Sequence, residues 1–197
     1  MNKKTRKTIL AVLIIVVILV VVLILITNRL GKKAEKNAKY AVGNYITFGT
    51  YPQTADGTDN TPIEWLVLDR DGDKALLISR YGLDSHSHKS DLYYRDWEQT
   101  SLRKWLNEDF LNTAFTSEQQ KRILLTTVDN SRSQGYSGWD TDSQRDFKLN
   151  YTETRDKVFL LSCAEAYKYF GVTYEDTENV KARVAPTEFA AAHRAWV

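Results

Sequence analysis

An uninterrupted apolar run near the N-terminus constrains this chain more than any other feature. Every residue from Ile9 to Ile26 is Ile, Leu, Val or Ala. At about 1.5 Å per residue, a helix over this run nearly spans a hydrocarbon core of roughly 30 Å. A cleaved signal peptide is the alternative, but the run is longer than the usual apolar region of about 7–15 residues, and no convincing cleavage site follows it. The pattern therefore predicts an uncleaved transmembrane helix over residues 9–27.

The charges that flank this run predict how the chain crosses the membrane. Four basic residues lie in the tail formed by residues 1–8, and five lie in the polar stretch 28–42. The two counts nearly balance, but the leading cluster is tight and adjoins the free amino terminus, which favours a cytoplasmic N-terminus. We therefore expect a single-pass protein of the cell membrane, with a polar stalk over residues 28–42 and an extracytoplasmic domain over residues 43–197.

The net charge of +2 conceals an uneven distribution. Residues 1–39 carry nine of the 27 Lys and Arg residues and one of the 25 Asp and Glu residues, which leaves 18 basic and 24 acidic residues in the remainder. An acidic domain is a poor match for a phosphate backbone, so we expect no nucleic-acid partner. The basic flank of the helix is better explained by lipid headgroups.

Short patterns within the domain predict an α+β fold. The stretch 44–51, NYITFGTY, alternates as a strand does, and the apolar run 157–161, KVFLL, is consistent with a buried strand. The apolar runs Ile63–Leu68 and Ala75–Ile78 flank the Asp-Gly pair at 71–72, which suits the type I′ turn of a hairpin.

Three helices are expected after the hairpin. Apolar residues recur at helical spacing over residues 101–115, with Ser101 as the N-cap. Capping-box patterns begin at Thr116 and at Ser162, and Gly171 stands where a C-terminal cap belongs. These signals place the start of each helix more firmly than its end.

Two acidic or histidine-containing stretches resemble metal sites. His86 and His88, with Asp84 or Asp91, could supply zinc ligands, but no second His/Cys pair exists and His193 stands alone near the end. The stretch DRDGDK at 69–74 lacks the calcium-loop spacing, and turn chemistry explains its Asp-Gly pair. We therefore interpret both stretches as solvated connections and expect neither a metal nor another cofactor.

The single cysteine has a structural and a catalytic interpretation. One cysteine excludes an internal disulfide. Cys163 follows an apolar run at the start of a helix, where a thiol could be activated, but no histidine lies close to it in sequence. We expect it to be a small buried packing residue.

Aromatic residues in polar segments are the candidate contacts for a ligand. Such side chains stack on sugars or peptides, and alternatively fold back as lids over the core. The long polar segment 131–156 is either a functional excursion or an insertion. The candidate ligand-binding residues are Tyr93, Tyr94, Trp97, Tyr136 and Trp139.

The order of four stretches resembles the bacterial domain family DUF6273. These are ITFGTYPQT, TPIEWLVLDRDGDKALLISRYGLD, WEQTSLRKWLNEDFLNTAF and DKVFLLSCAEAYKYF, and the resemblance covers roughly Gly43 to Val197. It implies a C-type-lectin-like domain, with a mixed, twisted sheet and flanking helices, of the kind carried by membrane-anchored or secreted chains of Gram-positive bacteria. Family members usually continue into segments similar to W-L-R-S-P-G and G-V-R-P-A, which are absent here. The resemblance therefore leaves open whether the domain is complete at its C-terminus.

The resemblance to this family implies no activity. The E-P-N and W-N-D calcium motifs of sugar-binding lectins are absent, and so are the paired cysteines of formylglycine-generating enzymes. We interpret the chain as a membrane-anchored recognition module that binds a cell-envelope polymer or a protein, and we expect a binding role rather than catalysis. The alternatives are a cell-wall hydrolase of unrecognised mechanism and a truncated, non-functional family member.

Overall fold

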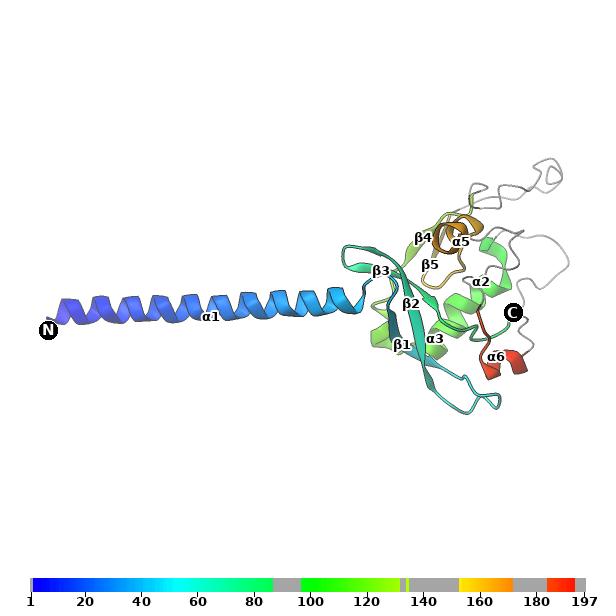
Figure 1. The fold of residues 1–197 in the computed structure, drawn as a ribbon, viewed down its shortest axis with the longest axis horizontal. Helices are drawn as coiled ribbons and strands as arrows, with labels where there is room; N and C mark the ends of the chain where they lie inside the picture. Colours follow the sequence, from blue (N-terminus) through cyan, green and yellow to red (C-terminus); the bar gives the residue numbers. More distant parts are fainter. Residues whose placement is uncertain (1, 87–96, 132–133, 135–152, 172–183, 194–197) are drawn as a thin grey trace.

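A single long helix, α1 (Lys3–Lys39), carries the rest of the chain at its C-terminal end. Figure 1 shows this computed structural model, which describes residues 2–86, 97–131, 134, 153–171 and 184–193. From Leu13 to Ile26 every side chain of α1 is 45–62 % exposed. Exposed apolar side chains along a whole helix are what a membrane-spanning segment has. This helix is long and apolar enough to cross a membrane.

The segment predicted as a stalk is the continuation of α1. The helix runs through residues 28–39 without a break and ends at Lys39. Gly43, with a φ of +88°, then turns the chain into the first strand. Arg70 and Asn44 then tie this end to the domain: Arg70 Nη1 donates to the carbonyl of Asn37 at 3.0 Å, and Asn44 Nδ2 donates to the carbonyl of Ala38 at 2.8 Å.

Three antiparallel strands form the main sheet in the order β1 (Tyr45–Tyr51), β2 (Thr61–Asp71) and β3 (Lys74–Ser79). The predicted first strand and the hairpin are both confirmed. The hairpin turn, however, is shifted by one residue. Asp71 pairs with Lys74, so that Gly72 and Asp73 form the turn, and Gly72 supplies the positive φ of +56°.

A helical segment packs against this sheet. It comprises α2 (Ser101–Trp105), a π-helical turn η2 (Leu106–Phe110) and α3 (Leu111–Ala114). The helix is confirmed, but its N-cap is Thr100, not Ser101, because Thr100 Oγ1 accepts from Arg103 N at 3.1 Å. Gly49 allows the close approach: its φ is +74°, and a Cβ there would come within 2.6 Å of the Ala114 carbonyl.

The core lies between the sheet and this helical segment. Its buried residues come from β1, β2, the chain after β3 and the helical segment, and partly buried Trp65, Trp97 and Phe189 pack around them. Aromatic contacts link the layers, including Tyr51 with Phe110 at 5.1 Å between ring centres. The core residues are Tyr51, Ile63, Leu83, Leu106, Phe110, Leu111, Ala114 and Phe115.

The remaining elements surround this core. They are the short helices η1 (Trp97–Gln99), α4 (Ser117–Gln120), α5 (Cys163–Phe170) and α6 (Glu188–Ala192), and a two-stranded antiparallel sheet of β4 (Thr126–Val128) and β5 (Thr154–Asp156). The α+β class with one N-terminal apolar helix is confirmed. Every strand pair in the described ranges is antiparallel rather than mixed, and a single parallel bridge joins Gly82 to Pro186.

The predicted helix starts at Thr116 and Ser162 are confirmed, whereas the predictions for the length of the first of these helices, for a strand over 157–161 and for Cys163 are not. Both capping boxes are present, and Gly171 ends α5 with a left-handed φ of +67°. The helix at Thr116 lasts only four residues, however, and residues 157–161 form no strand, since β5 ends at Asp156 and Leu160 is exposed. The prediction that Cys163 is buried is wrong, because its thiol lies on the exposed first turn of α5.

Candidate functional site

Most of the aromatic residues predicted to bind a ligand lie outside the described residues. This holds for Tyr93, Tyr94, Tyr136 and Trp139, for His88, and for most of the segment 131–156. Trp97 and His86 are described, and each has a defined surrounding. The contact surface predicted from the sequence therefore stays a prediction for four of its five residues.

Trp97 is turned toward the interior. Its ring packs against the core cluster, and Nε1 donates to Asp156 Oδ2 at 3.0 Å. A polar edge that is hydrogen-bonded to a buried carboxylate cannot bind a ligand without leaving that partner. The position of Trp97 agrees with the alternative of a lid over the core.

Asp156 is the centre of a buried polar network. Its side chain is 0 % exposed, and it accepts from Arg103 Nε at 2.8 Å and from Thr154 Oγ1 at 2.7 Å. Arg103 supplies the neutralising charge, and Trp97 completes the set of donors. Both carboxylate oxygens are thus occupied, so this network joins η1, α2 and β5 and offers nothing to a ligand.

A second carboxylate, Asp84, stands at the surface with different partners. Tyr51 Oη donates to Asp84 Oδ2 at 2.7 Å, and His193 Nδ1 lies 3.0 Å from Asp84 Oδ1. The side chain of Asp84 is 14 % exposed and that of His193 is 48 % exposed. The three groups form a Tyr–Asp–His chain that runs from the core to the solvent.

Three elements bring this chain of groups together. Tyr51 is the last residue of β1, Asp84 follows the bridge at Gly82, and His193 caps the C-terminus of α6. The helix α6 is fixed to that bridge because Thr187 N donates to the carbonyl of Gly82 at 2.9 Å, and its own N-cap is the Thr187 hydroxyl.

The surroundings of Tyr51 keep it protonated. Burial raises the pKa of Tyr51 above its usual value, and the hydrogen bond to Asp84 and the negative charge of Asp84 raise it further. Tyr51 therefore acts as a permanent donor that fixes one oxygen of Asp84. The other oxygen, Oδ1, accepts from Ser85 N at 2.7 Å and also faces the His193 imidazole.

His193 is the solvent-facing end of the arrangement. When Nδ1 carries the proton it donates to Asp84, and Nε2 is then an acceptor on a half-exposed ring. Phe189 packs edge-on against this ring at 4.1 Å between ring centres. An imidazole held in one tautomer by a carboxylate can accept a proton or bind a ligand donor.

His86 belongs to the same end of the domain. Its ring stacks on Trp105 at 5.0 Å and 7° between planes, and Trp105 contacts Phe110, which in turn contacts Tyr51. We call the residues Tyr51, Asp84, His86, Trp105, Phe189 and His193 the Asp84 cluster. Within the described ranges no group of three or more His, Cys, Asp or Glu side chains could hold a metal ion.

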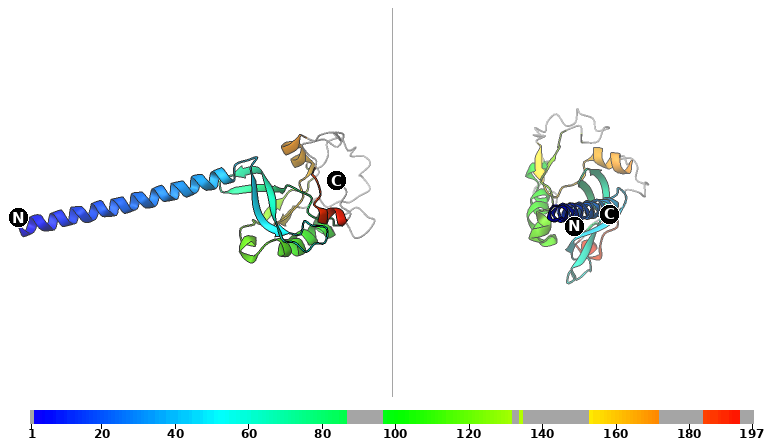
Figure 2. Two further views of the ribbon diagram at one scale, coloured as in Figure 1. Left: turned by 60° about the horizontal axis from the view of Figure 1, so that its bottom comes forward. Right: turned by 90° about the vertical axis from the view of Figure 1, so that its left-hand side faces the viewer.

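The α6 part of the cluster lies far from α1. In Figures 1 and 2, α6 lies at the end of the domain opposite the point where α1 enters it. No local sequence pattern signals this site, because Asp84 and His193 are 109 residues apart. His193 stands alone in the sequence, and in the fold it contacts Asp84.

Comparison with known proteins identifies a family and no individual relative. A family model described as "Domain of unknown function (DUF6273)" matches residues 72–190, more than half of the chain. No curated protein and no solved structure matches the chain. The match runs from the β2–β3 turn into α6, so β1 with Tyr51 precedes it and His193 follows it, although both belong to the same folded unit.

Proposed function

We propose that this chain, which belongs to the DUF6273 family, is a membrane-anchored recognition module whose domain lies outside a bacterial cytoplasm. Its ligand is a polymer of the cell envelope, a peptide or another protein. The family resemblance to C-type-lectin-like domains belongs to this proposal, as does the Gram-positive origin. A recognition role needs a binding surface that the membrane does not cover.

The observation that carries the proposal is the position and chemistry of the Asp84 cluster. It lies at the end of the domain away from α1, and it offers a carboxylate, a half-exposed imidazole and an exposed His86 stacked on an indole. Aromatic and polar groups side by side are typical of surfaces that bind sugars and peptides. Tyr93, Tyr94, Tyr136 and Trp139 remain candidate ligand contacts from the sequence, and they lie outside the described residues.

Binding to purified Gram-positive sacculi tests the recognition role. The full chain in detergent micelles is co-sedimented with sacculi, and Tyr93→Ser/Tyr94→Ser, Tyr136→Ser/Trp139→Ser and His86→Ala/His193→Ala are compared with it. We expect at least one variant to bind about tenfold more weakly or worse, as for a binding hot spot.

Tyr167→Ser is the matched control. Tyr167 is 62 % exposed on α5, so its removal deletes an exposed aromatic ring that the proposal does not assign to the binding surface. Equal binding by all variants and the control, or no binding by the native chain, would count against recognition of the cell wall.

A hydrolase is the second candidate, and the Asp84–His193 contact of 3.0 Å favours it. In such a reaction His193 Nε2 takes a proton from water while Asp84 stabilises the imidazolium. The test is release of soluble fragments from sacculi by the full chain. His193→Gln must abolish the release, whereas a rate that this change leaves intact contradicts the assignment.

A further inference from the structure

The C-terminal end of α1 is capped by side chains of the domain. An α-helix ends with four carbonyl groups that have no partner within the helix. Two of these groups in α1 accept from the domain: Arg70 Nη1 donates to the Asn37 carbonyl at 3.0 Å, and Asn44 Nδ2 donates to the Ala38 carbonyl at 2.8 Å. The charge of Arg70 also suits the negative end of the helix dipole. The helix would lose these caps if it moved away from the domain.

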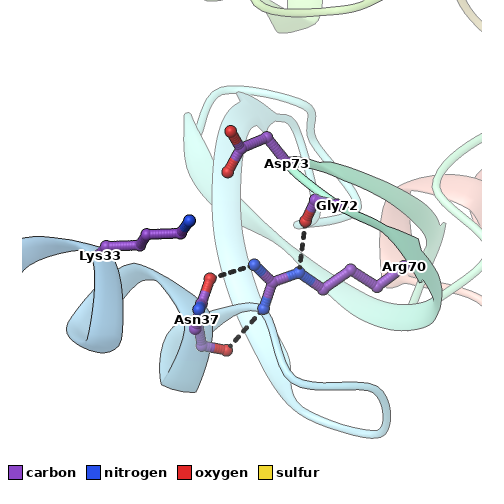
Figure 3. A pocket seen from close by; sticks show the side chains of 5 residues that line it. All are labelled: Lys33, Asn37, Arg70, Gly72 and Asp73. Atoms are coloured by element: carbon purple, nitrogen blue, oxygen red, sulfur yellow. Dashed lines mark hydrogen bonds between the residues drawn. The ribbon is translucent and has the colours of Figure 1, made fainter. Parts of the chain in front are cut away.

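Arg70 links α1 to the main sheet through three hydrogen bonds. Besides the bond to the Asn37 carbonyl, Nη2 donates to Asn37 Oδ1 and Nε donates to the Gly72 carbonyl at 3.0 Å (Figure 3). Because the guanidinium group is planar and rigid, these bonds fix the helix end and the hairpin turn in one arrangement. Arg70 lies on β2, the central strand of the sheet. A movement of α1 relative to the sheet therefore breaks two charge-assisted hydrogen bonds.

A second arginine reaches the same end of α1 from another part of the domain. Arg122, which follows α4, donates from Nη2 to Tyr40 Oη at 3.2 Å, and its guanidinium group lies over the Phe48 ring at 5.0 Å from the ring centre. Phe48 belongs to β1 and packs against the core. Tyr40 is the first residue after α1, so the two arginines hold the helix end at neighbouring points.

The connection between α1 and β1, residues 40–44, is itself hydrogen-bonded. Four of its five backbone amides donate to a carbonyl group, namely those of Tyr40, Ala41, Gly43 and Asn44. The Gly43 amide reaches the Val67 carbonyl of β2 at 2.9 Å, so the connection is attached to the central strand before β1 begins. A flexible linker behaves as a random coil without such bonds. The connection therefore adds to the rigidity of the junction.

The junction lies beyond the surface of a bilayer that α1 spans. Lys39, the last residue of α1, is 13 residues beyond Ile26, the last residue of the apolar run, which corresponds to about 20 Å along the helix axis. Headgroups occupy about 5–8 Å on each side of the hydrocarbon core. The junction is then about 12 Å outside the headgroups, so contacts within the chain, rather than lipids, set the angle between α1 and the domain.

We propose that α1 and the domain form one rigid body, so that the transmembrane helix sets the height and the orientation of the Asp84 cluster relative to the membrane. Arg70, Arg122 and the hydrogen-bonded connection fix the junction. A rotation or tilt of α1 then turns the domain with it, and a force on the domain reaches α1. The height rests on α1 being a membrane anchor, whereas the rigidity of the junction is independent of the recognition role.

Distances between two nitroxide spin labels in the full chain test the rigidity. One label is attached to the native Cys163 and the other to Asn28→Cys, an exposed position on α1. Cys163 reports on the domain because α5 is bound to β2, with Lys168 Nζ 2.9 Å from Asp69 Oδ2. Double electron–electron resonance of this chain in detergent micelles should give one narrow distance distribution. The chain labelled at Cys163 alone identifies any distance between two copies.

Arg70→Ala/Arg122→Ala is expected to broaden this distribution. Between residues 28 and 39 the helix is about 16 Å long, so a swing of about 30° about its end moves the label by roughly 8 Å. The β1–β2 ladder stays in place, and tryptophan fluorescence checks that the domain is folded. Asn37→Ala/Tyr40→Phe removes partners of both arginines from the α1 side and leaves the domain unchanged. It should broaden the distribution in the same direction, and it decides the question if the arginine variant unfolds.

Two controls bracket the result. Arg80→Ala removes an arginine whose partners Glu64, Tyr45 and Tyr81 all belong to the domain, so the distribution should stay narrow. A Gly-Ser-Gly-Ser insertion after Ala41 gives the breadth expected of a free joint.

Two results would overturn the proposal. A native distribution as broad as that of the insertion would mean that α1 swings freely on the domain. A narrow distribution that persists in both junction variants would mean that the arginine contacts do not fix the junction. Both results leave the recognition role standing, since binding to sacculi tests that role separately.

Discussion

Two aspartates in this domain have similar partners but opposite surroundings. Asp156 and Asp84 each accept a hydrogen bond from an aromatic side chain, Trp97 and Tyr51 respectively. Asp156 is fully buried and paired with Arg103, whereas Asp84 is partly exposed and faces an imidazole. A saturated, neutralised carboxylate holds elements together, and only the second arrangement leaves a group at the surface that can exchange a proton or meet a ligand.

Intrinsic fluorescence can test this contrast on the full chain. All five tryptophans lie after residue 60, so the signal reports the domain and not α1. Thermal unfolding in detergent micelles then measures each substitution. We expect the loss of stability to be largest for the buried carboxylate of Asp156, smaller for Asp84 and smallest for the exposed Asp69.

Asp156→Ala is expected to be the most damaging change. It leaves the Arg103 charge without its partner in a partly buried position and removes the acceptor of Trp97 and Thr154. We expect a loss of about 3 kcal/mol, at the lower end for a broken buried pair because Arg103 is 26 % exposed. The unfolding midpoint should fall by roughly 6–12 °C.

Asp109→Ala is the control for this change. Asp109 is an exposed aspartate on the same helical segment, and its replacement should alter stability by no more than about 0.5 kcal/mol. Equal effects of the two substitutions would mean that the buried network contributes nothing to stability.

Asp84→Ala is expected to have an intermediate effect. The buried hydroxyl of Tyr51 loses its acceptor, which costs about 1 kcal/mol because water can partly replace the carboxylate at this partly exposed position. Asp84→Asn keeps an acceptor oxygen and should be close to the native chain in the same melt. A loss in the Asn variant as large as in the Ala variant would show that the charge, not the hydrogen bond, stabilises this site.

Asp69 extends the comparison to an exposed carboxylate and should have the smallest effect. Lys168 Nζ, the Arg70 amide and Tyr169 Oη donate to it and lower its pKa to about 2. Because this is below the unfolded value of about 3.9, its contribution is present above about pH 4 and is lost as the pH falls toward 2. The difference in unfolding midpoint between the native chain and Asp69→Asn should therefore shrink over this interval, and a constant difference would contradict the shift.

Features that depend on neighbouring residues could be predicted from the sequence. The hairpin, the two capping boxes and the cap at Gly171 each involve groups within a few positions of one another, so local chemistry determines them. The errors at Ser101 and at the hairpin turn amount to one residue, because two adjacent residues could each fill the same role.

The candidate site could not be predicted in the same way. Asp84 and His193 meet only because α6 is attached to Gly82 by the parallel bridge, and nothing near either residue signals the other. Local patterns also failed to predict which apolar residues are buried. The apolar run at 157–161 and Cys163 resemble interior segments, but packing leaves Leu160 and Cys163 exposed.

Labelling of Cys163 in intact cells is the most direct test of a membrane-anchored module with its site outside the cytoplasm. Cys163 is the only cysteine in the chain and is exposed on α5, so the native protein carries its own reporter. A membrane-impermeant maleimide should label it without permeabilisation, whereas Cys163→Ser/Asn2→Cys, with its thiol at the cytoplasmic end, should react only after lysis. Labelling of Cys163 only after lysis would place the domain, and with it the Asp84 cluster, in the cytoplasm and would contradict the proposed function.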